Sequence, residues 1–369
     1  MARLEEVCEI LDSKRVPITA KDRVAGPYPY YGANGVQDYV ADYIFDDELV
    51  LLAEDGGHFG STDKPIAYRV SGRCWVNNHA HVLKPKECID VDYLCYSLMF
   101  RDVSDIVNGA TRQKLTQADM RKIEIPLLSI AEQKAVVNKI GKVFELIALR
   151  KEQLAKLDQL VKSRFIELFG DPVTNEKKWT RLTLGDICEI GSSKRVFEKD
   201  YVPNGVPFFR TKEIVELSKG NSISTELFIS EEHFSKLKKT YGAPRKGDLL
   251  ISAVGTIGTI WIVSGDFEFY FKDGNLLQIK ASPNFNSIFM KYLLDELIAN
   301  CKKEMSTGTA YSALTIVGLK KMLVYDVPLA LQEQFAAFVE QTDKSKLAIQ
   351  QSLDKLETLK KSLMQEYFG

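Results

Sequence analysis

The sequence lacks the features that mark secreted and membrane proteins. No apolar run approaches the roughly 18 residues that span a bilayer, and the N-terminus MARLEEVCEIL is acidic where a signal peptide begins with basic residues. No two cysteines have CxxC spacing; they are Cys8, Cys74, Cys88, Cys95, Cys188 and Cys301. We therefore expect reduced, mostly buried thiols in a soluble cytoplasmic protein.

An excess of basic residues is also missing. Lys and Arg number 49 against 50 Asp and Glu, so the formal net charge is −1. A strongly basic chain would indicate nucleic-acid binding, but a neutral one does not exclude it, because clustering on one face decides binding. With 369 residues, of which 45% are hydrophobic, the chain has length for two or three domains with cores of their own.

The sequence motifs of common enzymes are absent. There is no GxxxxGK[ST] phosphate loop, no glycine-rich cofactor fingerprint, no Asp-Pro-Pro-Tyr or Asn-Pro-Pro-Tyr, and no HExxH. His79 and His81 would lie on one face of a strand, but without a third ligand nearby we expect packing or polar contacts, not a metal site. The glycine-rich run 253–259 has no lysine and predicts a tight turn between strands. We predict no catalytic residue, metal or cofactor in this chain.

An internal duplication organises the chain. Seven segments recur in the same order, namely 4–10 with 184–190, 28–31 with 206–209, 48–53 with 248–253, Asn78 and Val82 with Asn275 and Ile279, 109–116 with 308–315, Ile125-Pro126 and Glu132-Gln133 with Val327-Pro328 and Glu333-Gln334, and 169–170 with 368–369. The offset grows from 180 (Leu4 to Leu184) to 199 (Gly170 to Gly369), so the second copy is about 19 residues longer. We expect the extra residues in its loops.

Each copy begins with a compact mixed part. Short apolar runs at 49–53, 75–83, 249–253 and 259–263 predict strands, and 91–100 and 287–299 predict short helices. Turn sequences lie between them at 33–35, 55–57, 203–205 and 272–274. We expect an α+β fold with mixed globular domains at 1–128 and 171–329 and long helices at 129–170 and 330–369.

Each copy ends in a long helix. Residues 131–169 contain no proline and one glycine, Gly141; Ser129 is a candidate N-cap, and Gly170 and Gly369 stand at C-cap positions. Apolar residues recur at heptad-like spacing, at Ile140, Val143, Ile147, Leu154, Leu157, Val161 and Leu168, and at Ile349, Leu353, Leu356, Leu363 and Tyr367. A helix of about 39 residues is roughly 58 Å long.

The order of the parts predicts how the helices pair. If the second helix packs on the first, it must run back antiparallel to it, as a coiled coil with approximate two-fold symmetry. Two similar heads at a fixed separation suit a ligand with two similar sites at a fixed separation. Duplex DNA has that property, because half-sites about one turn apart present the same groove.

These residues resemble a known family over nearly the whole chain. The segments 29–35 (PYYGANG) and 247–258 (GDLLISAVGTIG), the stretches 109–116 and 308–315, and the paired Pro-Leu and Glu-Gln junctions are similar to the specificity (S) subunit of type I restriction–modification systems. The resemblance implies two target recognition domains that each read one half of a split DNA sequence in the major groove. It also implies helices that set the spacer and dock two methyltransferase subunits. S-adenosylmethionine, ATP and Mg are then expected on the methyltransferase and restriction subunits.

Candidate DNA contacts follow from the chemistry of recognition. Lys and Arg bind phosphates, whereas Arg, Lys, Asn and Gln make two-pronged hydrogen bonds to base edges. In the first domain the loops at 28–34, 55–62, 77–79 and 111–114 supply Tyr28, Tyr31, Asn34, Asp55, His58, Thr62, Asn77, His79, Thr111, Arg112 and Lys114. In the second, the segments 192–195, 210–212 and 309–311 and two single positions supply Ser193, Lys194, Arg195, Arg210, Lys212, Thr256, Lys272, Thr309 and Tyr311.

The same residues have simpler interpretations. The tyrosines between 28 and 31 suit a core, and Arg112, Lys114, Lys194 and Arg195 suit a solvated surface. The first domain also lacks the apolar-Arg strand that the second shows at 207–211 (PFFRT), so the two domains are expected to read different half-sites.

Two alternatives to the specificity subunit remain. One is a specificity module of a fused or stand-alone methyltransferase or nuclease, which the missing cofactor and metal motifs oppose. The other is a structural coiled-coil adaptor, which the two elaborate, divergent heads oppose.

The near-zero charge also predicts weak DNA binding by the chain alone.

Overall fold

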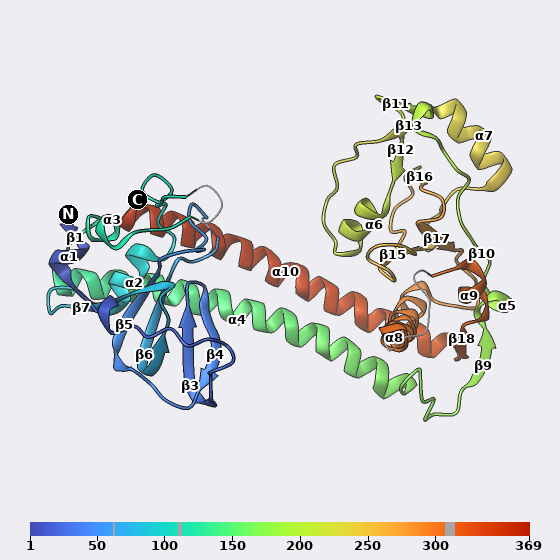
Figure 1. The fold of residues 1–369 in the computed structure, drawn as a ribbon. Helices are drawn as coiled ribbons and strands as arrows, with labels where there is room; N and C mark the ends of the chain where they lie inside the picture. Colours follow the sequence, from blue (N-terminus) through green and yellow to red (C-terminus); the bar gives the residue numbers. More distant parts are fainter. Residues whose placement is uncertain (62, 110–112, 307–313) are drawn as a thin grey trace. The chain divides into compact units, whose positions relative to one another are not determined.

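The computed structural model describes residues 1–61, 63–109, 113–306 and 314–369, without the side chains of 304–306, and divides into two compact units. Unit 1 is Met1–Gln153 with Ile349–Gly369, and unit 2 is Leu154–Ala348. Each unit holds one mixed α/β part and a portion of both long helices (Figure 1). Because the division cuts both helices, it does not locate the ends of the globular parts, and the domain boundaries stay predictions.

A six-stranded sheet forms the centre of unit 1. Its strand order is β2 (Cys8–Ile10), β7 (Ala80–Pro85), β5 (Phe45–Ala53), β6 (Ala67–Val76), β3 (Ala25–Gly32) and β4 (Gly35–Val40). β3 pairs with β6 in parallel and the other neighbours are antiparallel. The remaining elements are β1 (Ala2–Arg3) paired with β8 (Glu124–Ile125), α1 (Leu4–Val7), the 3-10 turn η1 (Asp12–Lys14), α2 (Val91–Met99) and α3 (Gln117–Arg121).

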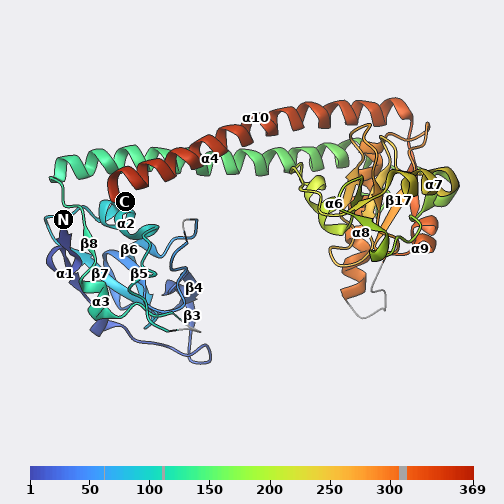
Figure 2. The ribbon, with the colours of Figure 1, turned by 90° about the horizontal axis from the view of Figure 1, so that it is seen from above.

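The core of unit 1 follows from its central strand. Residues 49–53 of β5 form a continuous apolar run and are all fully buried, as expected for a strand covered on both faces. α2 lies between this sheet and the long helices of the unit (Figure 2), with Tyr96 stacked on Phe144 at 5.4 Å between ring centroids. The globular part of unit 1 therefore packs against the long helix α4 through α2.

Unit 2 contains two four-stranded sheets. One has the order β10 (Ile190–Gly191), β17 (Leu276–Ile279), β14 (Leu249–Ser252), β15 (Ile260–Ile262), and the other β11 (Tyr201–Val202), β13 (Phe228–Ile229), β12 (Val206–Phe209), β16 (Tyr270–Phe271). Its other elements are β9 (Thr180–Thr183) paired with β18 (Leu323–Asp326), α5 (Leu184–Ile187), the 3-10 turn η2 (Glu198–Asp200), α6 (Thr211–Ser218), α7 (Glu231–Tyr241), α8 (Ser287–Ser306) and α9 (Ile316–Lys321).

The strand orders confirm the duplication. β2-β7-β5-β6 of unit 1 matches β10-β17-β14-β15 of unit 2, and the parallel pair β3–β6 matches the parallel pair β12–β16. The long strand β6 therefore corresponds to two short strands, β15 and β16. The extra length of the second copy was expected in loops, and this is wrong: helices α6 and α7 and strand β13 stand between β12 and β14, where unit 1 has only β4.

The two long helices are α4 (Ile130–Phe169) and α10 (Leu329–Phe368). The Ser129 hydroxyl and Glu132 form a capping box at the start of α4, and Gly170 ends it with φ +77°, as predicted. Of the predicted apolar stripe, Ile140, Val143, Ile147, Val161, Leu353 and Leu363 are buried.

The helices are antiparallel within each unit. In unit 1 the Lys139 Nζ donates to the Tyr367 hydroxyl at 3.0 Å, and the Lys151 Nζ lies 3.0 Å from the Glu357 carboxylate. In unit 2 the Lys346 Nζ lies 2.7 Å from the Asp158 carboxylate. The predicted α+β fold with long antiparallel helices is confirmed.

Of three local predictions, two need correction and one is confirmed. The strand predicted at 75–83 is broken at 77–79, where a turn separates β6 from β7, and the loop predicted at 28–34 is mostly β3, with the turn at Ala33 and Asn34. The turn predicted at 253–259 is confirmed between β14 and β15. It requires Gly258, which has φ +79° and where a Cβ would lie 2.5 Å from Ile298 of α8.

Two expectations from composition are also testable here. Cys8, Cys74, Cys95 and Cys188 are buried, and burial raises the pKa of the Cys8 thiol to about 12, so these thiols are unreactive packing residues. Within the part of the chain that the structure describes, no helix is both long and apolar enough to cross a bilayer.

Candidate nucleic-acid interface

Several predicted residues of unit 1 meet at one end of its sheet. We define the unit 1 loop cluster as the turn 33–34 after β3, the loop 54–57 after β5, the turn 77–79 before β7, and the described residues of 108–115. Backbone hydrogen bonds join three of these segments: the Glu54 amide donates to the His79 carbonyl, the Gly56 amide to Gln113, and the Leu115 amide to Glu54. These three segments are therefore joined through their backbones.

Side chains complete the unit 1 loop cluster. The Asn34 amide donates to the Gly56 carbonyl at 3.0 Å, and the Asp55 carboxylate lies 2.7 Å from the His79 Nδ1. Asn77 is buried, donates to Gln37 and accepts from the His79 amide, so it shapes the turn. Asn34 and Lys114 are exposed. The structure thus brings together Asn34, Asp55, Asn77, His79 and Lys114.

Other predicted residues of unit 1 lie elsewhere. Tyr31 touches the unit 1 loop cluster through its carbonyl, which accepts from the Asn77 amide, while its ring packs against the sheet core. The Tyr28 ring stands edge-on to Tyr43 at 5.1 Å, and its hydroxyl accepts from Arg73. His58 is half-buried in the loop after β5. Thr62, Thr111 and Arg112 lie outside the described residues.

Unit 2 forms a corresponding group of loops. We define the unit 2 loop cluster as 192–195, 209–212, 253–259 and 272–275. The Ser193 hydroxyl donates to the Phe271 carbonyl, the Lys194 amide to the Tyr270 hydroxyl, the Lys272 amide to the Phe209 carbonyl, and the Ala253 amide to Asn275. Ser193, Lys194, Arg195, Arg210, Lys212 and Lys272 are thereby neighbours. Thr256 is exposed in the β14–β15 turn, and Thr309 and Tyr311 lie outside the described residues.

Carboxylates hold several of the predicted cations. The Arg195 Nε lies 3.0 Å from Asp273, and Glu226 lies 2.8 Å from both Arg210 and Lys212, while Arg210 also binds Glu213. Hydrogen bonds from Lys212 and Arg210 lower the pKa of Glu226 to about 2, so it is ionised at neutral pH. Arg195, Arg210 and Lys212 are therefore locally neutralised.

A buried charged network behind the unit 1 loop cluster was missed. The prediction that His79 and His81 lie on one face of a strand is wrong. His79 lies in the turn before β7, whereas His81 is a fully buried residue of β7. His81 lies 2.7 Å from Asp12 and 3.6 Å from Glu54. β7 is buried without alternation from Ala80 to Leu83, and a histidine inside such an apolar run is a signal that could have marked the network.

This network is a poor metal site. Asp12, Glu54 and His81 each offer a ligand atom within 4.8 Å of the others. The Arg15 guanidinium, however, lies 2.5 Å from Glu54 and 3.5 Å from Asp12, and Lys114 lies 3.0 Å from Glu54. A divalent cation would have to displace these cations, so the residues present do not fit one.

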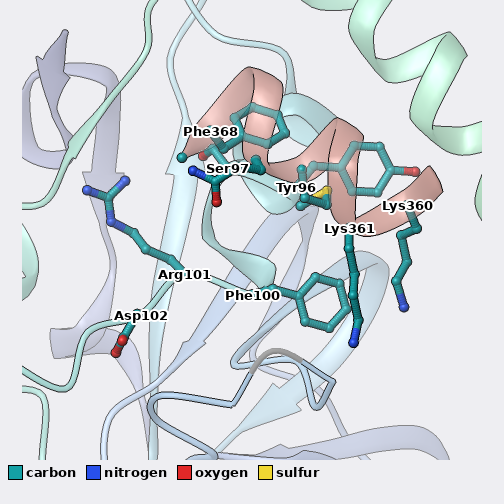
Figure 3. A pocket seen from close by; sticks show the side chains of 11 residues that line it. Tyr96, Ser97, Phe100, Arg101, Asp102, Lys360, Lys361 and Phe368 are labelled. Atoms are coloured by element: carbon teal, nitrogen blue, oxygen red, sulfur yellow. The ribbon is translucent and has the colours of Figure 1, made fainter. Parts of the chain in front are cut away.

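A pocket of about 510 Å³ lies in unit 1 between α2 and the last turns of α10. Figure 3 shows Tyr96, Phe100 and Phe368 around it, with Lys360 and Lys361 on α10. The Lys360 ammonium lies 5.2 Å from the Phe100 ring centre. Aromatic rings with cations at the rim are typical of a surface that contacts another protein.

Comparison with known proteins agrees with these observations. A family model described as the type I restriction modification DNA specificity domain matches residues 1–159 and again 176–360. A putative type I restriction enzyme specificity subunit of Haemophilus influenzae is 30% identical, over 98% of this chain and 94% of that protein. The type I restriction enzyme MjaVIII specificity subunit of Methanocaldococcus jannaschii is 21% identical, over 92% of this chain and 84% of its own length.

Solved structures share the fold. The S subunit of the type I restriction–modification system of M. genitalium has a TM-score of 0.62 at 15% identity and covers 100% of this chain and 95% of its own. A chain from work on complex assembly and conformational transition of the type I R-M system has a TM-score of 0.57 at 18% identity, covering 100% and 96%. The double match of the family model covers most of the sequence, and the chain belongs to the type I restriction modification DNA specificity family as a specificity subunit.

Proposed function

We propose that this specificity subunit reads a split DNA target, with the unit 1 loop cluster on one half-site and the unit 2 loop cluster on the other. One observation carries the proposal. In both units the segment after the central strand (β5 or β14) and the turn before its neighbour (β7 or β17) are joined by backbone hydrogen bonds. A duplicated scaffold that presents loops at the same end of its central strands suits two comparable DNA segments.

The two clusters differ in chemistry, so the half-sites should differ. Unit 1 presents Asn34, Asp55 and His79, whereas unit 2 presents Ser193, Arg195 and Lys272. Asn side chains suit adenine edges and Arg or Lys suit guanine. Contacts of individual residues with bases or phosphates stay predictions.

The helices are proposed to set the spacer between half-sites and to dock two methyltransferase subunits. Leucines on both helices are exposed to solvent, among them Leu146, Leu149, Leu160, Leu347 and Leu359. Exposed leucines on a helix pair suit a partner helix. The pocket beside Phe368, at the last turns of α10, offers a further apolar contact site in unit 1.

Catalysis is proposed to belong to the partners. S-adenosylmethionine is expected on the methyltransferase subunits, and ATP and Mg on two restriction subunits if these join the complex in the cytoplasm. Since carboxylates neutralise Arg195, Arg210 and Lys212, the chain alone should bind DNA weakly and tighten its hold with its methyltransferase.

A reconstitution experiment tests the proposal. The purified chain with S-adenosylmethionine and DNA should give no methylation, and addition of the cognate methyltransferase subunit should give methylated adenine within a split motif. Methylation or cleavage by the chain alone would overturn the proposal and favour a fused or stand-alone enzyme. A contiguous motif would overturn the division of the target between the units.

A further inference from the structure

The charged network behind the unit 1 loop cluster links distant parts of the chain. Asp12 stands in η1, Glu54 at the end of β5, and His81 in β7, and all three are buried. Arg15 joins them, with 12% of its side chain exposed. Buried charges are costly unless each is paired, so this arrangement has to be satisfied group by group.

His81 is held between two acceptors. Its Nδ1 lies 2.7 Å from the Asp12 carboxylate and its Nε2 lies 2.9 Å from the Leu115 carbonyl oxygen. Neither partner atom carries a proton, because a backbone carbonyl only accepts and Asp12 is ionised. Burial opposes that ionisation, but hydrogen bonds from His81, the Val82 amide and Gln117 hold the pKa of Asp12 below its usual value. His81 therefore bridges the Asp12 carboxylate and the Leu115 carbonyl through its two ring nitrogens.

Glu54 carries the second half of the network. The Arg15 guanidinium donates to the Glu54 carboxylate at 2.5 Å and to the Ala80 carbonyl at 2.7 Å. The Lys114 ammonium lies 3.0 Å from the other carboxylate oxygen of Glu54. Arg15 thus lies against both carboxylates, and Lys114, with 52% of its side chain exposed, is a second cation at Glu54.

The network is continuous with the loops themselves. His81 holds the Leu115 carbonyl, while the Leu115 amide donates to Glu54 at 2.7 Å and the Glu54 amide donates to His79 at 2.9 Å. Three of the segments that form the unit 1 loop cluster are therefore anchored to the buried His81 ring and the two carboxylates beside it. Displacing His81 would release Lys114 and its neighbours from their present placement.

We propose that His81, bridging Asp12 and the Leu115 carbonyl, is a positioning residue that determines how unit 1 discriminates its DNA half-site. It holds the Lys114 ammonium and the loop after β5 at the protein surface without touching DNA. The inference rests on the proposed function. It applies to unit 1 alone: in β5 and β7 Leu52 pairs with His81, whereas the corresponding pair of β14 and β17 is Ile251 with the apolar Leu277.

The test is the fidelity of methylation by the chain assembled with its methyltransferase. In the His81→Gln complex, methylation of DNA altered in the unit 1 half-site should rise about tenfold relative to the intact target, which corresponds to about 1.4 kcal/mol. Discrimination at the unit 2 half-site should be unchanged. Unchanged fidelity at both half-sites would overturn the inference. If the unaltered complex methylates no split motif, the proposed function fails instead.

Gln133→Leu is the matched control for a loss of stability. Gln133 is buried in unit 1 and makes three hydrogen bonds at the start of α4; its partners Cys88 and Asp90 follow β7, at the end opposite to the turn 77–79. At a similar loss of thermal stability, this variant should keep the fidelity of the unaltered complex. If both variants relax the same half-site equally, stability and not positioning is responsible, and the inference is wrong.

A milder variant covers a folding failure of His81→Gln. The exposed Gln117 donates to the Asp12 carboxylate at 2.9 Å, so Gln117→Ala loosens the network from outside the core. It should relax the unit 1 half-site by a smaller factor, about threefold, which corresponds to about 0.6 kcal/mol. Fidelity equal to that of the unaltered complex would contradict the inference.

Discussion

Gln133 and Gln332 make the same set of hydrogen bonds, each within its own unit. The side-chain Oε1 of Gln133 accepts from the Asp90 backbone amide, and its Nε2 donates to the Cys88 and Leu128 backbone carbonyls. The Gln332 carbonyl accepts from the Asn286 amide, and its Nε2 donates to Asn284 and Val327. Both side chains are fully buried. Each ties the first turn of a long helix to the residue that precedes a second helix, α2 in unit 1 and α8 in unit 2.

This equivalence corrects the alignment of the two copies. The sequence comparison paired Glu132-Gln133 with Glu333-Gln334, whereas the structure pairs Gln133 with Gln332. Gln334 is exposed, so the hydrogen-bonding role and not the dipeptide is repeated.

Replacing Gln133 by leucine should destabilise unit 1. The change leaves one buried amide and two carbonyls without their partner, which costs about 1–3 kcal/mol. Amide hydrogen exchange should speed up in β7, α2 and the start of α4 while unit 2 keeps its protection. Gln332→Leu should give the reverse pattern, and a loss of protection in both units from either variant would contradict the separate roles.

The Asp12 carboxylate should contribute stability that depends on pH. Because its pKa in the folded state lies below the ordinary value of 3.8, the contribution is complete above that value and is lost as pH falls through the folded pKa. Asp12→Asn should therefore destabilise the chain by about 3–5 kcal/mol at neutral pH.

The difference in the free energy of unfolding between Asp12→Asn and the unaltered chain should then shrink as pH falls below about 4. Urea unfolding at several pH values measures it. Asp105→Asn, at an exposed position, serves as the control and should change stability little. A gap that stays constant or widens in acid would show that the Asp12 carboxylate is not stabilised by folding.

Releasing the cations of unit 2 should strengthen DNA binding. Glu226→Gln removes the carboxylate that binds Lys212 and Arg210 and raises the net charge from −1 to 0. If these cations face phosphates, affinity should rise several-fold and fall more steeply with salt. Fluorescence anisotropy of the assembled complex over a salt series measures both. Glu232→Gln, which makes the same charge change at the Lys236 pair, should have a smaller effect, and equal effects would point to long-range charge alone.

Lengthening the connection between the helix and the second recognition part should change the spacer of the DNA target. An insertion of a few helical residues at 170–174 should alter the number of unread bases and leave both half-sites intact. Modification-sensitive sequencing of the host genome determines the motif. As a control, an insertion of equal length at 220–225, between α6 and β13, should leave the spacer unchanged. An altered half-site after the first insertion would contradict the proposal that the helices set the spacer length.

Charging the exposed leucines of α4 should weaken the partner complex. Leu149 is 44% exposed, and Leu149→Lys places an ammonium in the proposed apolar interface. Co-purification with the methyltransferase subunit should fall at least about tenfold, since a buried unpaired charge costs several kcal/mol. Val24→Lys, at an exposed position before β3, should leave assembly unchanged. Equal assembly of both variants would place the partner elsewhere.

The duplication, the long helices and the β14–β15 turn follow from the sequence because each depends on local pattern. Heptad spacing, the capping Ser129 and the terminal Gly170 are local signals, and central strands such as β5 appear as apolar runs. The division of the second copy into two sheets was not predictable in this way. The pairing of β12 with β16 joins residues about sixty positions apart, and no local period encodes it.

What only the tertiary structure decided is which polar residues share a site. Asp12 and His81 lie 69 positions apart and Arg210 and Glu226 lie 16 apart, yet each pair is in contact. Residue type alone marked Lys114 and Arg210 as cations, but whether such a cation is free or neutralised depends on the carboxylates that folding brings beside it. Sequence pattern fixes which residues are buried along one element, whereas the pairing of charges depends on how separate elements pack.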